Sequence, residues 1–215
     1  MFFFKRKNKN TEDLESYINT IDQAIIEYKD GVNNYLVGKT DDFNHNLEVL
    51  NGFDTEASIL RRKIETNLYT QTYLLKASGD IMRLVSSMYH IINLMNESLF
   101  QFEIEAPYIL PELNEDFTKL TQLSTLTAEC VIPLAKAYFY LPETINEKIH
   151  RVYFYKKEAT TQSQALKRKV FHQMNKLKQS EKIHLRYFAL HIENIAVAAE
   201  IVADQLAVMS IKQNI

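Results

Sequence analysis

The residues of this 215-residue chain that are best suited to chemistry are carboxylates and histidines with helical spacing. Two Glu-x-x-His pairs occur, Glu147 with His150 and Glu181 with His184. Such pairs on facing helices are typical of di-iron bundles, whose metals take carboxylate and imidazole ligands. Here each pair falls at the start of a predicted helix. The starts of antiparallel neighbours lie at opposite ends, about 40 Å apart for about 25 residues. The spacing therefore excludes a shared metal and indicates surface pairs.

Two other residues with chemical potential are Asp54 and Cys130. Asp54 falls on an apolar helical stripe where a leucine is expected, so its carboxylate must be paired, bind a metal or lie at a bundle edge. Cys130 has no histidine in its predicted helix, which favours a small buried residue over a nucleophile. A single cysteine also excludes an internal disulfide framework and fits a reducing compartment. The glycines are isolated, so no phosphate-binding loop is predicted.

The elements that must position these residues are predicted to be helices. The chain has only four glycines and four prolines, which disfavours sandwiches, barrels and doubly wound sheets with their many tight turns. Residues 71–79 are predicted to be a connection, with Ser78 and Gly79 as the breaker. Apolar periodicity predicts six helices, which begin near Asn10, Thr40, Ile81, Asn114, Pro142 and Ser180.

Two parts of the chain repeat the same pattern. An apolar stripe at alternating steps of three and four runs from Ile81 to Phe102 and again from Leu185 to Met209. The segment 60–64, Leu-Arg-Arg-Lys-Ile, returns as Leu-Lys-Arg-Lys-Val at 166–170. Prolines in residues 106–111 separate the halves. The chain is therefore predicted to be one all-α domain, 1–215, with three-helix bundles at 10–105 and 112–213.

Charge is distributed unevenly along the chain. Residues 101–147 are mainly acidic and residues 151–186 mainly basic. The basic stretch could meet phosphates or anionic lipid, or it could be a solvated helix face. The opening residues Met1 to Lys7, with three Phe before three bases, do not form a signal peptide. This segment could make a peripheral membrane contact or pack as a tail on the body. No stretch approaches the roughly 20 apolar residues of a membrane span.

The chain resembles the PhoU-like phosphate-transport-regulator family over nearly its whole length. The opening Met-Phe-Phe-Phe-Lys-Arg-Lys is similar to the start of many members. Residues 56–64, Glu-Ala-Ser-Ile-Leu-Arg-Arg-Lys-Ile, resemble the family's Glu-Ala-Asp-x-Leu-Arg-Arg-x-Ile. Residues 192–204 resemble its Ile-Glu-x-Ile-Ala-Asp-x-Ala-Glu-Asp-Val-Ala-Asp. The similarity is to the subfamily that often accompanies low-affinity phosphate transporters.

The resemblance implies two pseudo-symmetric three-helix bundles and a role in regulation. It implies a non-enzymatic cytoplasmic protein, working at the inner face of the membrane, that regulates or assists inorganic phosphate uptake. The partner would be a phosphate transporter or its regulatory partner, bound through protein–protein interaction.

The aromatic residues follow helical spacing and are predicted to be core, so no nucleic-acid partner is expected. Met-rich and aromatic-rich faces allow a homodimer. The alternative is a helical scaffolding module with degraded metal sites and no phosphate role. A phosphohydrolase with paired His-Asp is excluded, because no adjacent His-Asp occurs.

Some members of the family bind iron or zinc through Glu/Asp-x-x-x-Asp motifs on one helical face. By position, Ser58 replaces the second acid after Asp54, and Tyr89 and Asn93 stand where acids are expected in the third helix. Thr160 and Gln164 replace the acidic pair of the fifth helix, and Val197 replaces the partner of Glu193. We therefore expect no catalytic residue and no cofactor. We also expect less than one iron or zinc per chain, with the remaining acids exposed or paired with neighbouring bases. The residual metal candidates are Asp54, Glu56, Glu97, Glu193, Glu200 and Asp204.

Overall fold

The computed structural model describes residues 9–70 and 75–213, and side chains within 12–70 and 78–212. The N-terminal Phe/Lys/Arg segment and residues 71–74 of the predicted connection lie outside these ranges. Within them the protein is all-α, as predicted, and a 3₁₀ turn, η2 (Pro142–Thr144), precedes the fifth helix. The helices are α1 (Lys9–Leu36), α2 (Thr40–Thr70), α3 (Leu75–Glu105), α4 (Pro111–Tyr140), α5 (Ile145–His172) and α6 (Gln179–Gln213).

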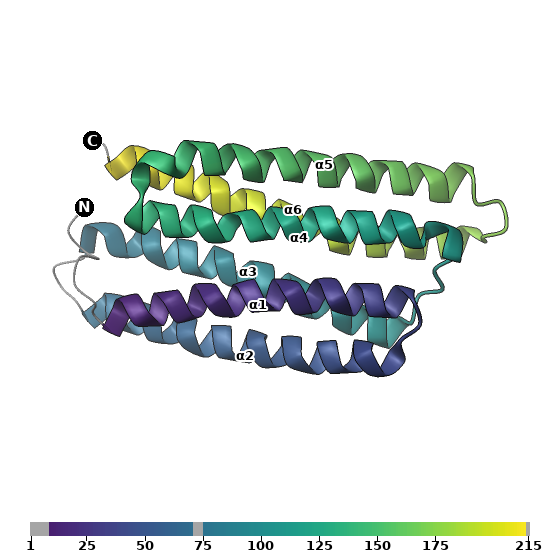
Figure 1. Ribbon diagram of the computed structural model, residues 1–215, viewed down its shortest axis with the longest axis horizontal. Helices are drawn as coiled ribbons and strands as arrows, with labels where there is room; N and C mark the ends of the chain where they lie inside the picture. The colour runs from purple at the N-terminus through teal and green to yellow at the C-terminus, as the bar shows by residue number, and fades with distance from the viewer. Residues whose placement is uncertain (1–8, 71–74, 214–215) are drawn as a thin grey trace.

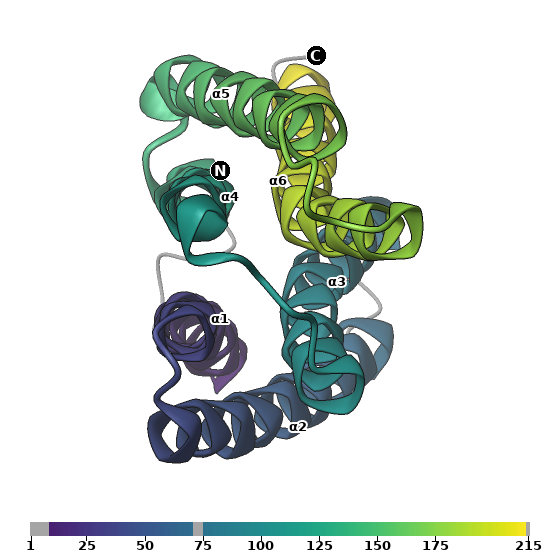
Figure 2. The same ribbon diagram turned by 90° about the vertical axis from the view of Figure 1, so that its right-hand side faces the viewer.

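The six helices lie along one long axis as two groups of three (Figure 1). Helices α1, α2 and α3 pack on one another, and α4, α5 and α6 do the same. Seen end-on, α1 and α4 lie on one side and α3 and α6 on the other, while α2 and α5 close the two ends (Figure 2). The halves therefore meet through two pairs of helices, α1 with α4 and α3 with α6.

The repeated apolar stripes form the buried faces of α3 and α6. Leu84, Met88 and Ile91 of α3 are almost fully buried, as are Phe188 and Ile192 of α6. Spacing of three and four residues keeps such side chains on one side of a helix, where each buried side chain contributes about 1.5–3 kcal/mol. The buried residues of α3 and α6 therefore have the same spacing in both halves of the core.

An aromatic cluster joins the two halves near one end of the bundle. The rings of Phe102 and Phe188 lie 4.6 Å apart between centroids, and the Tyr35 ring lies 4.8 Å from that of Phe102. The Tyr35 hydroxyl donates to the carbonyl oxygen of Pro107 at 2.8 Å. Aromatic pairs of this kind add about 0.5–1.5 kcal/mol beyond area burial. The cluster therefore ties α1, α3 and α6 together next to the connection between the halves.

Close packing and buried hydroxyls fix α1 on α3. The Tyr17 hydroxyl donates to the Val85 carbonyl oxygen at 2.6 Å, and the Tyr28 hydroxyl lies 3.0 Å from Ser98 Oγ. A Cβ added at Gly31 would lie 2.7 Å from Leu99 Cδ1, so a larger residue here would force the Leu99 side chain to move.

The predicted first residues of three helices, α3, α4 and α5, are wrong. Ser78 and Gly79 lie inside α3, not in a connection. Ser78 is buried, and the cost of about 1 kcal/mol for a helical glycine is small against the burial of the α3 stripe. Helix α4 begins at Pro111 instead of Asn114, because proline suits the first helical turn. Pro142 similarly opens η2, and α5 itself begins three residues later.

Candidate functional site

Asp54 lies in a polar cluster between α2 and α3. Its side chain is half-buried, and Asn96 of α3 is buried against it. The Asn96 side-chain amide donates to Asn51 Oδ1 at 3.3 Å and reaches Asp54 Oδ2 at 3.5 Å. Tyr89 also donates a hydrogen bond to the Asp54 carboxylate, and the positive charge of Arg61 attracts it. The acid on the apolar stripe is therefore met by amide and hydroxyl groups from the next helix.

Burial raises the pKa of Asp54, and the negative charge of Glu97 adds to the rise. Hydrogen bonds from Tyr89 and Asn96 and the charge of Arg61 lower this pKa but do not cancel the effect of burial. Proton binding to Asp54 therefore favours the folded state, and the charged carboxylate costs stability as pH rises through the folded-state pKa.

We expect Asp54→Asn to raise the free energy of unfolding at pH 7 by a few tenths to about 1 kcal/mol. The gain should shrink as pH falls toward about 4, where unfolded Asp also takes up a proton. Urea denaturation of both chains between pH 4 and 8 measures the difference. Glu56→Gln, an exposed change on the same helix, is the matched control. A gain that is constant across this pH range would contradict the prediction.

Arg61 stacks on Tyr89 in the same cluster. The Arg61 guanidinium carbon lies 4.5 Å from the centroid of the Tyr89 ring, within the range of a cation–π contact. Burial and the nearby Asp54 charge raise the pKa of Tyr89, so its phenol stays neutral at physiological pH. Tyr89, one of the two α3 residues that stand where the resemblance leads us to expect acids, therefore contacts a base instead of a metal ligand set.

The remaining acids of α6 are held by side chains of α5. Lys167 Nζ lies 2.8 Å from Glu193 Oε2, and Lys156 Nζ lies 2.7 Å from Glu200 Oε2. The Ser163 hydroxyl also donates to Glu193, at 2.6 Å. Each carboxylate thus has an ammonium group from the neighbouring helix beside it.

Asp204, farther along α6, has a neutral partner. The Tyr153 hydroxyl of α5 donates to Asp204 Oδ1 at 2.6 Å, and burial and this acceptor raise the pKa of Tyr153 to about 12. Tyr153 therefore remains a neutral phenol beside Asp204 at physiological pH.

These residues do not fit a multinuclear iron or zinc cluster. Such a cluster needs several carboxylates directed at shared metal ions. Glu193 and Glu200 of α6 form ion pairs with lysines, and Asp204 accepts a hydrogen bond from a tyrosine. Asp54 faces amide and phenol groups. Across the described side chains, no three His, Cys, Asp or Glu residues gather in a way that could hold a metal ion.

The other acids of the candidate set do not join these clusters. Glu56 is exposed on α2, and Glu97 is exposed on α3, where it accepts a hydrogen bond from Asn93 at 2.7 Å. The structure therefore brings Glu193, Glu200 and Asp204 onto the α5–α6 surface and leaves Asp54, Glu56 and Glu97 around α2 and α3.

The two Glu-x-x-His pairs serve separate local contacts. His184 Nε2 lies 2.7 Å from Glu105 Oε2 of α3, and Glu181 accepts the backbone N–H of Lys178 at 2.6 Å before the first turn of α6. Glu147 and His150 are exposed on α5. Each motif therefore contributes to the surface or to a helix end.

Cys130 is poorly placed for nucleophilic chemistry. It is buried in α4, and burial raises the pKa of its thiol. A raised pKa reduces the thiolate fraction at neutral pH, so this cysteine acts as a small packed residue.

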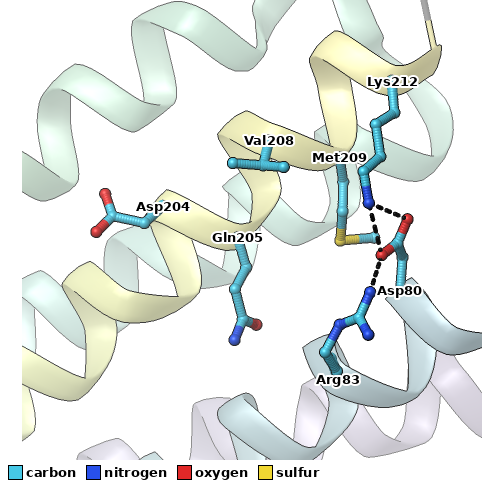
Figure 3. Close-up of a pocket in the computed structure, with 7 residues that line it drawn as sticks. All are labelled: Asp80, Arg83, Asp204, Gln205, Val208, Met209 and Lys212. Atoms are coloured by element: carbon cyan, nitrogen blue, oxygen red, sulfur yellow. Dashed lines mark hydrogen bonds and ion pairs between the residues drawn. The ribbon is translucent and has the colours of Figure 1, made fainter.

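A small pocket of about 240 Å³ lies between the start of α3 and the end of α6 (Figure 3). Lys212 and Arg83 both bind Asp80. Burial would raise the pKa of Asp80, but the hydrogen bonds and charges of Lys212 and Arg83 outweigh it and lower this pKa. Asp204 turns its carboxylate away from that group. Lys212 of α6 therefore joins the two halves through Asp80, whereas Arg83 lies on the same helix as this acid.

Comparison with known proteins identifies this arrangement of helices. No family model matches the sequence. A UPF0111 protein of Thermotoga maritima is 23% identical over 214 residues, which cover 99% of both chains. The crystal structure of a PhoU-like protein from Shewanella oneidensis matches with a TM-score of 0.86 and 14% identity, over 95% of this chain and 100% of that one. The chain has the PhoU-like fold. A second structure from the same organism, described as PhoU-like and phosphate regulatory, gives a TM-score of 0.82 at 13% identity, over 94% and 98% of the two chains.

The α5 side chains that contact the acids of α6 were not predicted from the sequence. Lys156, Lys167 and Tyr153 were not among the candidate site residues. For Lys167 the repeat offers a signal, because Lys167 takes the place of Arg61 in the repeated segment and both contact the third helix of their own half. A search for acids alone misses the bases that pair with those acids.

Proposed function

We propose that this chain is a non-enzymatic regulator or accessory protein of inorganic phosphate uptake that works by binding a partner protein. The observation that carries the proposal is the PhoU-like fold, shared from end to end with a protein described as phosphate regulatory. The match covers 98–100% of those chains and 94–95% of this one, so the likeness extends over both halves of the fold. The partner in this proposal is a low-affinity phosphate transporter or its regulatory partner, reached from the cytoplasm.

The chemistry of the acids supports a regulator over an enzyme. Among the described residues, the clustered carboxylates are bound by lysine, asparagine or tyrosine, and the cysteine is buried. We infer that the α5–α6 surface carries no iron or zinc, because the lysine ammonium groups supply the positive charge that a metal would bring there.

Deletion of the gene for this chain tests the proposal. We expect the initial rate of radiolabelled phosphate uptake to change at one or more external phosphate concentrations, and a plasmid copy to restore it. Uptake of an unrelated solute, such as sulfate, is the control for general effects on the membrane. Unchanged phosphate uptake at every concentration would contradict the proposal and favour the alternative of a helical scaffold without a phosphate role.

A further inference from the structure

Helix α6 carries a second apolar stripe on its exposed side. Its exposed members have exposed fractions from 36% for Leu190 to 63% for Ile211, and Val197 is half-buried. The members follow one another at steps of three, four or seven residues, which keeps them on one line of the helix. Asn194 and Asp204 are the polar interruptions on this line. We call this stripe the α6 seam, and it consists of Ile183, Tyr187, Leu190, Val197, Ile201, Val208 and Ile211.

The repeat shows that the fold itself does not require an apolar seam. When the buried stripes of α3 and α6 are matched, four adjacent seam positions correspond to polar residues of α3. Tyr187, Leu190, Val197 and Ile201 are matched by Arg83, Ser86, Asn93 and Glu97. At these four positions the equivalent surface of the first half is therefore polar, as a solvated helix face is expected to be, whereas Val208 is matched by the exposed Ile104. A long exposed apolar line in one half alone marks an interaction surface.

The side of the seam that borders α5 carries more basic than acidic side chains, five bases against Glu193, Glu200 and Asp204. Lys156 and Lys167 neutralise Glu200 and Glu193 there. Lys157 and Arg168 directly follow these two lysines on α5; both are exposed and have no ion-pair partner among the described side chains. Arg186 of α6, exposed in the same way, adds a third charge beside the seam. An acidic surface on a partner would complement this edge.

We propose that the α6 seam binds an amphipathic helix of a partner protein, with apolar residues at steps of three and four and acidic residues along the flank that faces α5. The seam runs from Ile183 to Ile211, or roughly 42 Å at 1.5 Å per residue, long enough for a helix of several turns. Apolar anchors at helical spacing give such contacts their affinity, and the flanking charges set the orientation. The proposal deepens the proposed function, because it rests on a regulator that works through a partner.

A second copy of the chain fits the seam less well. If two α6 helices paired antiparallel about a twofold axis, α5 of one copy would face α5 of the other. Lys157 and Arg168 would then approach their own copies, which is unfavourable. Helix α6, contrary to the sequence prediction, is long and apolar enough to cross a membrane by length and composition, but its Leu185–Met209 stripe is buried against the other helices. The free part of α6 is therefore a narrow face of a packed helix.

Two synthetic peptides as long as the seam test this proposal on the full chain. Both carry Leu and Ile at steps of three and four; one has Glu along one flank, and the other has Lys at the same positions. We expect fluorescence anisotropy to show at least about tenfold tighter binding of the Glu peptide at low salt. The double variant Ile201→Gln with Val208→Gln should weaken this binding at least about tenfold. Lys157→Gln with Arg168→Gln should remove the preference between the peptides.

The matched control places the same chemical change on other exposed apolar residues. Val37→Gln with Ile59→Gln should leave peptide binding unchanged, and equal thermal melting of both double variants verifies that they fold. Equal binding of the two peptides, or no binding of either, would overturn the proposal. So would a dimer in light scattering, or binding to vesicles that contain phosphatidylserine, that the Ile201 and Val208 changes abolish. Peptide binding without any effect of the gene on phosphate uptake would overturn the proposed function and leave the docking surface in place.

Discussion

Phe188→Ala is expected to lower the free energy of unfolding by about 3–5 kcal/mol, the range for removing a large aromatic side chain from a packed core. Phe188 is fully buried on α6, and its ring packs against Phe102 of α3. The change leaves a cavity at the contact between the two halves and removes an aromatic pair. Urea denaturation followed by circular dichroism gives the difference in unfolding free energy directly.

Phe154→Ala is the matched control for this change. Phe154 lies on α5 and is mostly exposed, so its removal should change the unfolding free energy by no more than about 0.5 kcal/mol. Two variants that differ by less than about 1 kcal/mol would show that the Phe102–Phe188 contact is not part of the stabilising core.

Lys167→Met is expected to cost about 1–3 kcal/mol, because it removes the ammonium group from a mostly buried carboxylate. The side chains of Lys167 and Glu193 are only 22% and 12% exposed. Methionine keeps much of the lysine stem, so the loss reflects charge more than packing. The charge of Glu193 then lacks its ammonium partner and keeps the hydrogen bond from Ser163.

The double variant Lys167→Met with Glu193→Gln separates the effect of charge from the loss of packing. It should recover most of the lost stability, since no unpaired carboxylate remains. Lys157→Met, an exposed change on the same helix, should have little effect. If the double variant is as unstable as Lys167→Met alone, the pair does not act as an ion pair. Thermal melts at constant salt provide the comparison.

Local pattern was sufficient to predict most of the fold. Alternating steps of three and four located the buried faces of α3 and α6, because such spacing has a direct geometric meaning in a helix. It failed where a single residue carried the argument. The sequence predicts a break at Gly79, but the burial of the α3 stripe outweighs the low helix propensity of glycine. Pro111 begins α4, because proline at a first turn lacks only a hydrogen bond that the helix does not make there.

The sequence identified the acids of the candidate site but not the residues that contact them. The apolar stripe of α2 identified Asp54 as an unusual acid. Its neighbour Asn96 lies on another helix, and nothing in local spacing links the two. The sequence predicts that Glu193 and Glu200 are exposed or paired with neighbouring bases, and the structure pairs both with lysines. The particular partners, Lys167 and Lys156, depend on how α5 and α6 align across a turn, which a single sequence does not specify.

The lysine pairs of α5 and α6 have a consequence for how this protein matures. In a metal-dependent fold, neutral charge at such a surface depends on loading, so folding follows metal supply and a chelator can reverse it. Here the neutralising cations are covalent parts of the chain. They are present as soon as the helices are synthesised, so we expect the charge of this surface to be independent of iron and zinc supply.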